Sequence, residues 1–198
     1  MIDKKKIIAL SGSTRKASSN LNIIKAIEEL SKDSFTFEIF YDLAELPHFN
    51  PDLDNENVPE NIIQFRKKLK EADGILICTP EYAIGVPGTL KNAIDWTVSS
   101  MEFSHKPVAL ITASLSGEKA HKSLLGTLLI IESRMTAHTQ LLISYVKTKL
   151  TSDGKIKEKD TLADIQKLIN SLNELIRNGQ GDQLTAPILM NDGVNSGE

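Results

Sequence analysis

One stretch near the start of the chain, residues 10–21 with the sequence LSGSTRKASSNL, constrains the fold most. It follows an apolar run at residues 7–10 and precedes apolar residues whose spacing places them on one helix face, namely Leu21, Ile24, Ile27 and Leu30. We therefore expect this stretch to connect a first strand to a first helix. In an open parallel sheet such a turn lies at the carboxyl end of the strand, where ligands bind.

The composition of this turn indicates the kind of ligand. It contains five hydroxyl side chains, one amide and two cations, and no acidic residue lies between Asp3 and Glu28. Gly12 allows a tight turn, and the N-terminus of the following helix offers unpaired N–H groups with a partial positive charge. Arg15 can hold two phosphate oxygens. The candidate phosphate ligands are Ser11, Ser13, Thr14, Arg15, Ser18, Ser19 and Asn20.

The spacing of the glycines excludes two common phosphate sites. The turn has no G-x-x-x-x-G-K-[ST] pattern, so a P-loop nucleotidase is disfavoured. It has no G-x-G-x-x-G pattern either, so a bound dinucleotide is not indicated. A serine-rich turn with one glycine suits a terminal monophosphate, such as that of FMN in flavodoxin-like folds. The alternative is a polar helix cap made by Ser18, Ser19 or Asn20, with nothing bound.

The rest of the chain alternates strands with helices. Strands are expected at residues 35–41, 73–79, 108–113 and 141–146, and helices at about 60–71, 89–100, 118–135 and 162–176. This alternation predicts an α/β, flavodoxin-like, doubly wound five-stranded parallel sheet with helices on both faces. The order 2-1-3-4-5 places the alternating second strand at an edge. It also puts the first turn beside Thr79, Pro80 and Glu81.

Length and charge limit the organisation of the protein and its partners. With 198 residues, of which 40% are hydrophobic, we expect a domain at residues 1–178 and a tail at 179–198 that is mobile or reaches a partner subunit. The net charge of −3 gives no general attraction to nucleic acid or to an anionic membrane. No signal peptide or membrane-length apolar run is visible, so a cytoplasmic location is expected. The polar loop at 42–59 has a length typical of loops that lie over a site.

A second motif, residues 79–96 with the sequence TPEYAIGVPGTLKNAIDW, carries a family resemblance. Together with residues 12–20, it resembles the NADPH-dependent FMN reductase family of flavodoxin-like proteins, which includes FMN, quinone, chromate and azo reductases. The resemblance covers roughly residues 5–145. It is specific because two separate motifs occur in the right order at the ends of the right strands.

The resemblance implies a bound FMN, with its phosphate on Ser13, Arg15, Ser18 and Asn20. Backbone groups of residues 80–83 and the Tyr82 side chain would border the isoalloxazine ring, and residues 113–117 would make a third contact. The candidate residues in these two loops are Pro80, Glu81, Tyr82, Ala83, Ile84, Ser114, Ser116 and Gly117.

The implied activity is that of an NAD(P)H oxidoreductase. A hydride would pass from NADPH or NADH to flavin N5, and then to a quinone, free flavin or similar small acceptor. Because the cofactor carries this chemistry, no catalytic side chain is assigned. Family members are usually homodimers or homotetramers with the active site near the subunit interface. No metal site is expected, because the four histidines lack metal-ligand spacing.

Two departures from the family pattern leave other hypotheses open. Ala83 stands where asparagine is common, and the third loop is short, continuing directly into Glu118. The alternatives are a flavodoxin-like electron carrier or regulator that does not use NADPH, and a domain that binds a non-flavin phosphate ester. Within the motifs, Glu81 is interpreted as a solvated or salt-bridged carboxylate, and His121 as a residue near the third loop that could reach the nicotinamide or the acceptor.

Overall fold

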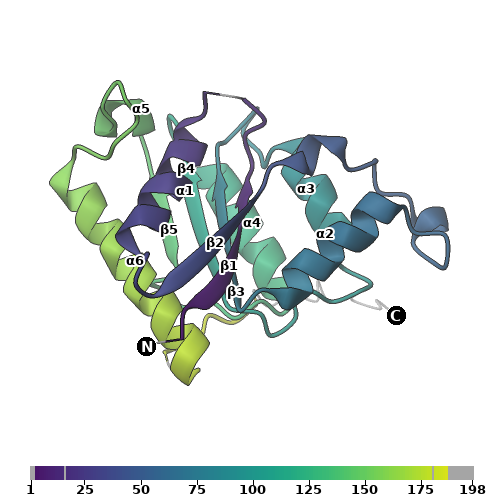
Figure 1. The fold of residues 1–198 in the computed structure, drawn as a ribbon. Coiled ribbons are helices and arrows are strands. Elements are labelled where there is room, and N and C mark those ends of the chain that lie inside the picture. The colour runs from purple at the N-terminus through teal and green to yellow at the C-terminus, as the bar shows by residue number, and fades with distance from the viewer. Residues whose placement is uncertain (1–2, 16, 180, 187–198) are drawn as a thin grey trace, which may run out of the picture.

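A computed structural model describes residues 3–15, 17–179 and 181–186, and it contains a five-stranded parallel sheet (Figure 1). The strand order is β2-β1-β3-β4-β5, and every neighbouring pair is parallel. The predicted order is therefore confirmed, with β2 at an edge. The strands are β1 (Lys5–Ser11), β2 (Phe35–Phe40), β3 (Gly74–Thr79), β4 (Val108–Ala113) and β5 (Gln140–Ile143).

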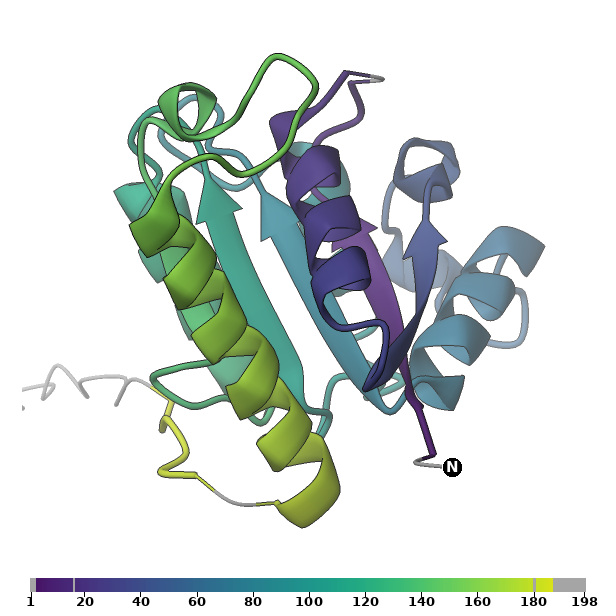
Figure 2. The ribbon, with the colours of Figure 1, turned by 60° about the vertical axis from the view of Figure 1, so that its left-hand side comes forward.

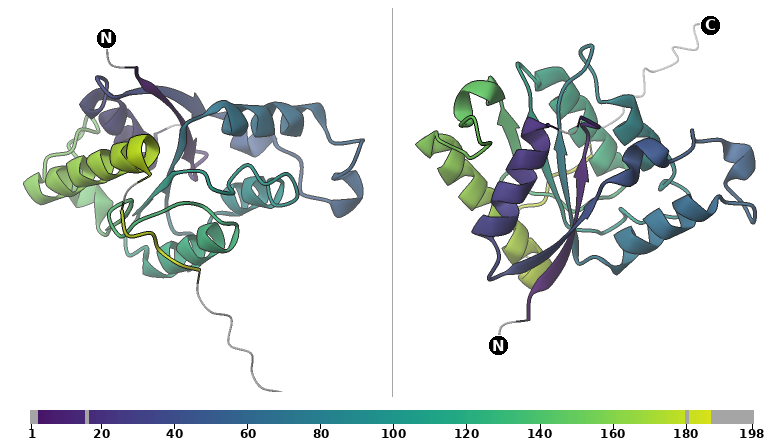
Figure 3. Two further views of the ribbon diagram at one scale, coloured as in Figure 1. Left: turned by 90° about the horizontal axis from the view of Figure 1, so that it is seen from below. Right: turned by 45° about the horizontal axis from the view of Figure 1, so that its top comes forward.

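Helices cover both faces of the sheet (Figures 2 and 3). On one face, α1 (Ser19–Leu30) and α6 (Lys159–Asn178) pack in a single apolar cluster. The other face is covered by α2 (Glu60–Glu71), α3 (Gly88–Asp95) and α4 (Glu118–Ile130), which share a second cluster. The fold is thus doubly wound, as the alternation of elements predicts.

The central strands feed both clusters because successive side chains of a strand point to opposite faces. In β3, Ile75 and Ile77 pack toward α2 and α3, whereas Leu76 and Cys78 pack toward α1 and α6. All six residues of β3 are buried. This explains why the strand is continuously apolar, as expected for a parallel strand with helices on both sides.

Three elements end earlier than their apolar patterns predict. Helix α3 stops at Asp95 rather than near residue 100, and the chain continues through turns to Met101, whose φ is 62°. Helix α4 stops at Ile130 rather than at 135, before Glu132 with a φ of 63°. Strand β5 stops at Ile143 because Tyr145 has a φ of 53° and begins a short helix, α5 (Val146–Lys149). Left-handed residues cannot continue a right-handed helix or a strand.

The predicted tail lies only partly within the described residues. In the described part, the Leu184 N–H donates to the Met135 carbonyl, and Gln183 forms an isolated bridge with Thr136. The apolar residues 188–190 lie outside the described residues. Among the described residues, no helix is both long and apolar enough to cross a membrane.

Candidate functional site

A cavity of about 350 Å³ opens at the carboxyl end of the sheet. It lies where the first turn meets the loops that follow β3, β4 and β5, as expected for ligand binding in an open parallel sheet. Its described lining residues are Ser13, Arg15, Ala17, Ser18, Ser19, Asn20, Pro80, Tyr82, Ala113, Ser114, Leu115, Tyr145, Val146, Lys147 and Thr148. The described lining contains two cations and no acidic residue.

The turn at residues 11–18, which we call the phosphate turn, lies directly against β3. The Gly12 N–H donates to the Cys78 carbonyl at 2.9 Å. A Cβ at Gly12 would lie 2.7 Å from the buried Thr79 Cβ, so only glycine allows this close approach. The Ser11 hydroxyl donates to the Ser13 carbonyl within the turn. Ser11 and Thr14 are not among the residues that line the cavity.

Ser18 begins helix α1 and also lines the cavity. Its side-chain oxygen accepts a hydrogen bond from the Leu21 N–H at 3.5 Å, so it is the cap that the simpler interpretation requires. One cap does not use the remaining polar groups. Ser13, Arg15 and Ser19 also line the cavity beside the positive end of α1. The turn therefore combines a capped helix with further donors that face open space.

Asn20 has a role that the sequence did not reveal. Its side-chain amide donates to the Ala113 carbonyl at 3.3 Å, and its oxygen accepts from the Cys78 thiol at 3.3 Å. The side chain is buried and ties α1 to the ends of β3 and β4. Asn20 forms part of the cavity wall, but both ends of its amide already have protein partners.

The loop after β3 forms a tight, strained turn. Tyr82 and Gly85 exchange backbone hydrogen bonds of 3.0 and 2.9 Å. Between them, Ala83 and Ile84 have φ values of 48° and 62°, which are unfavourable for side chains other than glycine and asparagine. The Tyr82 hydroxyl lies 3.5 Å from the Ser13 hydroxyl, so the two sequence motifs meet at the cavity. Ala83 and Ile84 themselves are not among its lining residues.

Glu81 is neither solvated nor salt-bridged, which corrects its interpretation from sequence. Its carboxylate accepts hydrogen bonds from the Gly117 N–H at 3.2 Å and from the Ala120 N–H at 2.8 Å. It thereby caps α4, where a negative charge is favoured. The Glu81 N–H also donates to the Ser114 hydroxyl at 3.2 Å. These contacts hold the second and third loops together beneath the cavity.

Two further residues named from sequence lie away from the cavity. Gly117 precedes α4 with a φ of 95° and lies, with Ser116, outside the lining. His121 is also not a lining residue; it is buried, with its ring nitrogens against the Thr112 hydroxyl and the Gln140 side-chain oxygen. Burial lowers the pKa of His121 below its ordinary value, although the bond to Gln140 opposes this shift. The ring is committed to the β4–β5 side of the sheet.

The sequence analysis missed the fourth wall of the cavity, which comes from the segment after β5. This wall contains Tyr145, Val146, Lys147 and Thr148. The apolar pattern through residue 146 looked like an uninterrupted strand, and it gave no signal of the left-handed turn at Tyr145. The shortness of the third loop was the only hint that another segment borders the site.

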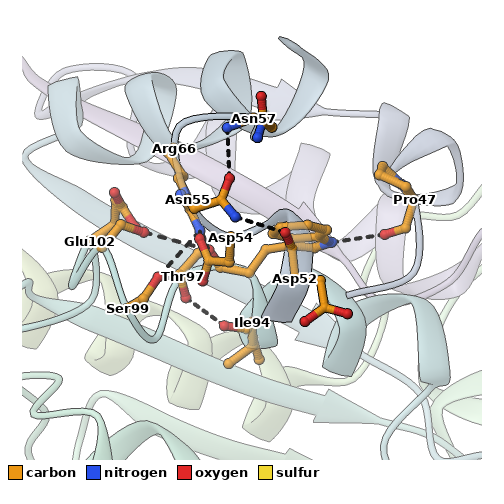
Figure 4. A network of polar contacts seen from close by, with 12 residues as sticks. Pro47, Asp52, Asp54, Asn55, Asn57, Arg66, Ile94, Thr97, Ser99 and Glu102 are labelled. Atoms are coloured by element: carbon orange, nitrogen blue, oxygen red, sulfur yellow. Dashed lines mark hydrogen bonds and ion pairs between the residues drawn. The ribbon is translucent and has the colours of Figure 1, made fainter. Parts of the chain in front are cut away.

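The long loop at 42–59 does not line the cavity, contrary to the expectation that it lies over the site. It contains two short 3₁₀ helices, η1 (Asp42–Glu45) and η2 (Pro51–Leu53). Figure 4 shows how residues 47–58, which we call the anchored loop, attach to α2 and to the chain after α3. Asp54 pairs with Arg66 at 2.7 Å, and the Pro47 carbonyl accepts from the Trp96 indole N–H at 2.8 Å.

No group of three or more potential metal ligands occurs among the described residues. Cys78 is buried in the core, and this burial raises the pKa of its thiol well above the usual range. The thiol therefore remains protonated and unreactive at neutral pH. The chemistry of the site rests on its hydroxyl, amide and cationic groups.

A family model described as NADPH-dependent FMN reductase matches residues 5–148, which is well over half of the chain and includes all four walls of the cavity. The chain belongs to the NADPH-dependent FMN reductase family. The resemblance seen in the two motifs is thereby confirmed, and it extends slightly beyond the region expected from sequence.

Curated relatives of similar length support this assignment. An NAD(P)H:quinone oxidoreductase of Solanum tuberosum is 33% identical over 178 residues, covering 86% of this chain and 92% of that protein. A 2-hydroxy-1,4-benzoquinone reductase of a Burkholderia species is 29% identical over 178 residues, covering 87% of this chain and 96% of that protein.

Solved structures agree with the fold. The flavoenzyme NAD(P)H:(acceptor) oxidoreductase FerB of Paracoccus denitrificans aligns with a TM-score of 0.71 at 25% identity, covering 87% of this chain and 97% of that one. An archaeal flavodoxin aligns with a TM-score of 0.59 at 13% identity over 86% of this chain and 98% of that one, which shows the fold alone. As a member of this family, the protein is a flavin-dependent NAD(P)H oxidoreductase with FMN as its cofactor and a small molecule as acceptor.

Proposed function

We propose that the cavity binds FMN with its phosphate at the phosphate turn, and that the protein reduces quinones or similar small acceptors. The observation that carries this proposal is the set of donors around the cavity. Ser13, Arg15 and Ser18 lie beside the positive end of α1, and no acidic residue is among the described lining. A dianionic monophosphate would find hydrogen-bond donors and positive charge there without a repelling carboxylate.

The remaining walls fit the rest of a flavin. The lining includes Tyr82 and Leu115, two half-exposed or exposed apolar side chains that suit an aromatic ring. The exposed backbone of the strained turn at Ala83 and Ile84 lies next to Tyr82 and could border the ring. FMN, when bound, supplies a ring that accepts and returns two electrons. The protein's own part is to bind, orient and shield that ring.

The overall reaction consumes one NAD(P)H, one proton and one quinone, and it yields NAD(P)⁺ and the hydroquinone. The relatives are named as quinone reductases, which favours this class of acceptor over others. A reductase for small molecules needs no nucleic acid, in keeping with the net charge of −3. A cytoplasmic location is part of the proposal, because NAD(P)H is an intracellular reductant.

Assembly into a homodimer or homotetramer is also part of the proposal. Four large apolar side chains at this end of the sheet are substantially exposed: Tyr82, Ile84, Leu115 and Tyr145. A cluster of exposed apolar residues marks an interaction surface. A second copy that covered this rim would also shield the cofactor. Light scattering coupled to size-exclusion chromatography should give the mass of a dimer or tetramer; a monomer at micromolar concentration would contradict this part.

The main test is titration of the purified protein with FMN and with riboflavin, followed by fluorescence. We expect FMN to be quenched and bound more tightly than riboflavin, which lacks the phosphate. Arg15→Met should weaken FMN binding by about tenfold or more, because a charge-assisted hydrogen bond is lost. It should leave riboflavin binding unchanged. Lys25→Met is the matched control, since Lys25 is an exposed residue of α1 that does not line the cavity.

Activity separates the reductase from the other hypotheses. With FMN bound, the protein should oxidise NADPH in the presence of a quinone much faster than free FMN does. A protein that binds FMN but does not consume NADPH would be an electron carrier or a regulator. Unquenched FMN would leave only a site for another phosphate ester, and the proposal would be wrong.

A further inference from the structure

The wall of the cavity after β5 is fixed to the third loop by its backbone. The Tyr145 N–H donates to the Leu115 carbonyl and the Val146 N–H donates to the Ser114 carbonyl, both at 3.0 Å. The Ser144 hydroxyl adds a bond of 2.8 Å to the Ser116 carbonyl. This short segment is therefore positioned by the site itself, and it is not a free surface turn.

The left-handed residue at the start of α5 directs the segment. Tyr145 has a φ of 53° and no glycine or asparagine substitutes for it, so its strain is sustained by surrounding contacts. Val146 is buried in the cluster below α1 and α6, which fixes the turn from beneath. As a result, Tyr145, Lys147 and Thr148 all line the cavity although they follow the end of the strand.

The two lysines of α5 have different surroundings. Lys149 pairs with the Glu158 carboxylate at 3.0 Å and does not line the cavity. Lys147 lines the cavity, and among the described residues no carboxylate lies within salt-bridge distance of its ammonium group. One lysine thus stabilises the connection to α6, whereas the other brings an uncompensated charge to the site.

Sheet order explains why this charge complements Arg15. Strand β1 ends at the phosphate turn and β5 ends at α5, and the ends of β3 and β4 lie between them. Figure 2 shows the phosphate turn and α5 at the same end of the sheet, apart from each other. The lining thus carries one cation on each of these two walls and no described acidic residue. A monophosphate carries about two negative charges at neutral pH and can accept from both.

We propose that Lys147 is a second phosphate-directed cation, which approaches the FMN phosphate from the α5 wall while Arg15 approaches it from the phosphate turn. This inference rests on the proposed function, because it assumes that FMN is the ligand. It assigns a binding role to a segment outside both sequence motifs. It also gives the short third loop a consequence, since that loop leaves α5 at the cavity wall.

The test compares two neighbouring lysines and two ligands. Lys147→Met should weaken FMN binding by about threefold to tenfold, less than a buried charge pair because the side chain is exposed. It should leave riboflavin binding and thermal stability unchanged. Lys149→Met is the matched control: it should leave FMN binding unchanged. Lys147→Arg should retain wild-type binding, and the loss in Lys147→Met should shrink as salt screens the charge.

The failures of the two proposals are distinguishable. Wild-type protein that does not bind FMN would overturn the proposed function together with this inference. Wild-type protein that binds FMN, with Lys147→Met equal to it, would overturn the inference alone. Equal losses for FMN and riboflavin, or equal losses in Lys147→Met and Lys149→Met, would also overturn it. Lys147→Gln is a second variant with a polar side chain, for use if the methionine variant aggregates.

Discussion

The anchored loop and the phosphate turn are both polar segments that follow a strand, yet their polar groups have opposite fates. In the anchored loop, Asp54 is nearly buried and its carboxylate is bonded to Arg66 and to Ser99 (Figure 4). In the phosphate turn, Ser13 and Arg15 face an open cavity. Polar groups with internal partners stabilise a fold, whereas groups that face a cavity are available to a ligand.

The difference teaches that loop length and composition do not identify a lid. The anchored loop has the prolines and acids typical of a surface loop, but Pro47 is fixed by Trp96 and by Asn92, whose amide donates to the same carbonyl at 2.9 Å. Phe49 adds a T-shaped contact with the Trp96 ring at 5.1 Å between centroids. We infer that this loop stabilises the α2–α3 face, and the predictions below test that division.

The largest expected effect is on stability, from Arg66→Met. The Arg66 guanidinium donates to Asp54 and to the Trp96 carbonyl and lies over the Trp96 ring at 5.9 Å. Its loss leaves a nearly buried carboxylate without a charged partner, which costs about 3 kcal/mol. Urea unfolding should show this loss. Lys91→Met, which breaks the exposed Lys91–Asp95 pair, should cost less than about 1 kcal/mol.

If the comparison holds, folded Arg66→Met protein should bind FMN as the wild type does. A tenfold weaker affinity for FMN at full folding would show that the anchored loop acts on the site, and the division between the two regions would be wrong.

The pH dependence of Asp54 gives the next effect. Burial opposes ionisation, but hydrogen bonds from Ser99 and Arg66 outweigh it and hold the pKa of Asp54 below its ordinary value. Because the folded pKa is lowered, the stabilisation is complete above the unfolded pKa of about 3.9 and is lost as the pH falls through the folded value. At neutral pH, Asp54→Asn should therefore cost about 1–2 kcal/mol.

Unfolding measured from pH 7 down to acid checks this sign. The stability gap between wild type and Asp54→Asn should stay constant down to about pH 4 and then narrow. A gap that widens in acid would contradict the assignment.

Glu81→Gln should produce a smaller effect and tests the joint between the second and third loops. Glutamine can still accept from the Gly117 and Ala120 N–H groups, but the negative charge at the start of α4 is lost. The expected cost is about 0.5–1 kcal/mol of stability, with little change in FMN affinity. Unchanged stability with a tenfold loss of FMN binding would instead return Glu81 to the role of a cofactor ligand.

The smallest expected effect is a gain in stability from Ile84→Asn. Ile84 is 74% exposed and left-handed, so its side chain contributes little burial while its backbone is strained. Asparagine tolerates this conformation, and the change should stabilise the protein by about 0.5–1 kcal/mol. Thermal unfolding measures it. Val98→Asn, at another exposed apolar residue without a left-handed backbone, is the control and should give no gain.

The sequence by itself determined the α/β class, the strand order and the two motifs that meet at the site. These features depend on local patterns: continuous apolar runs such as 75–78, helical spacing, and a polar turn after β1. The meeting of Ser13 with Tyr82 follows from them, because parallel neighbours end at the same edge. Cys78, expected in the core from its apolar neighbours, is buried there.

Only the tertiary structure decided which polar residues face the cavity and which are used elsewhere. Glu81 caps α4, Asn20 ties strand ends together and Asp54 anchors a loop, because each finds a partner far away in sequence. The end of β5 likewise depends on bonds from Tyr145 and Val146 to the third loop, about 30 residues earlier. A local pattern records what a residue can do, and the partner that folding brings to it decides what it does.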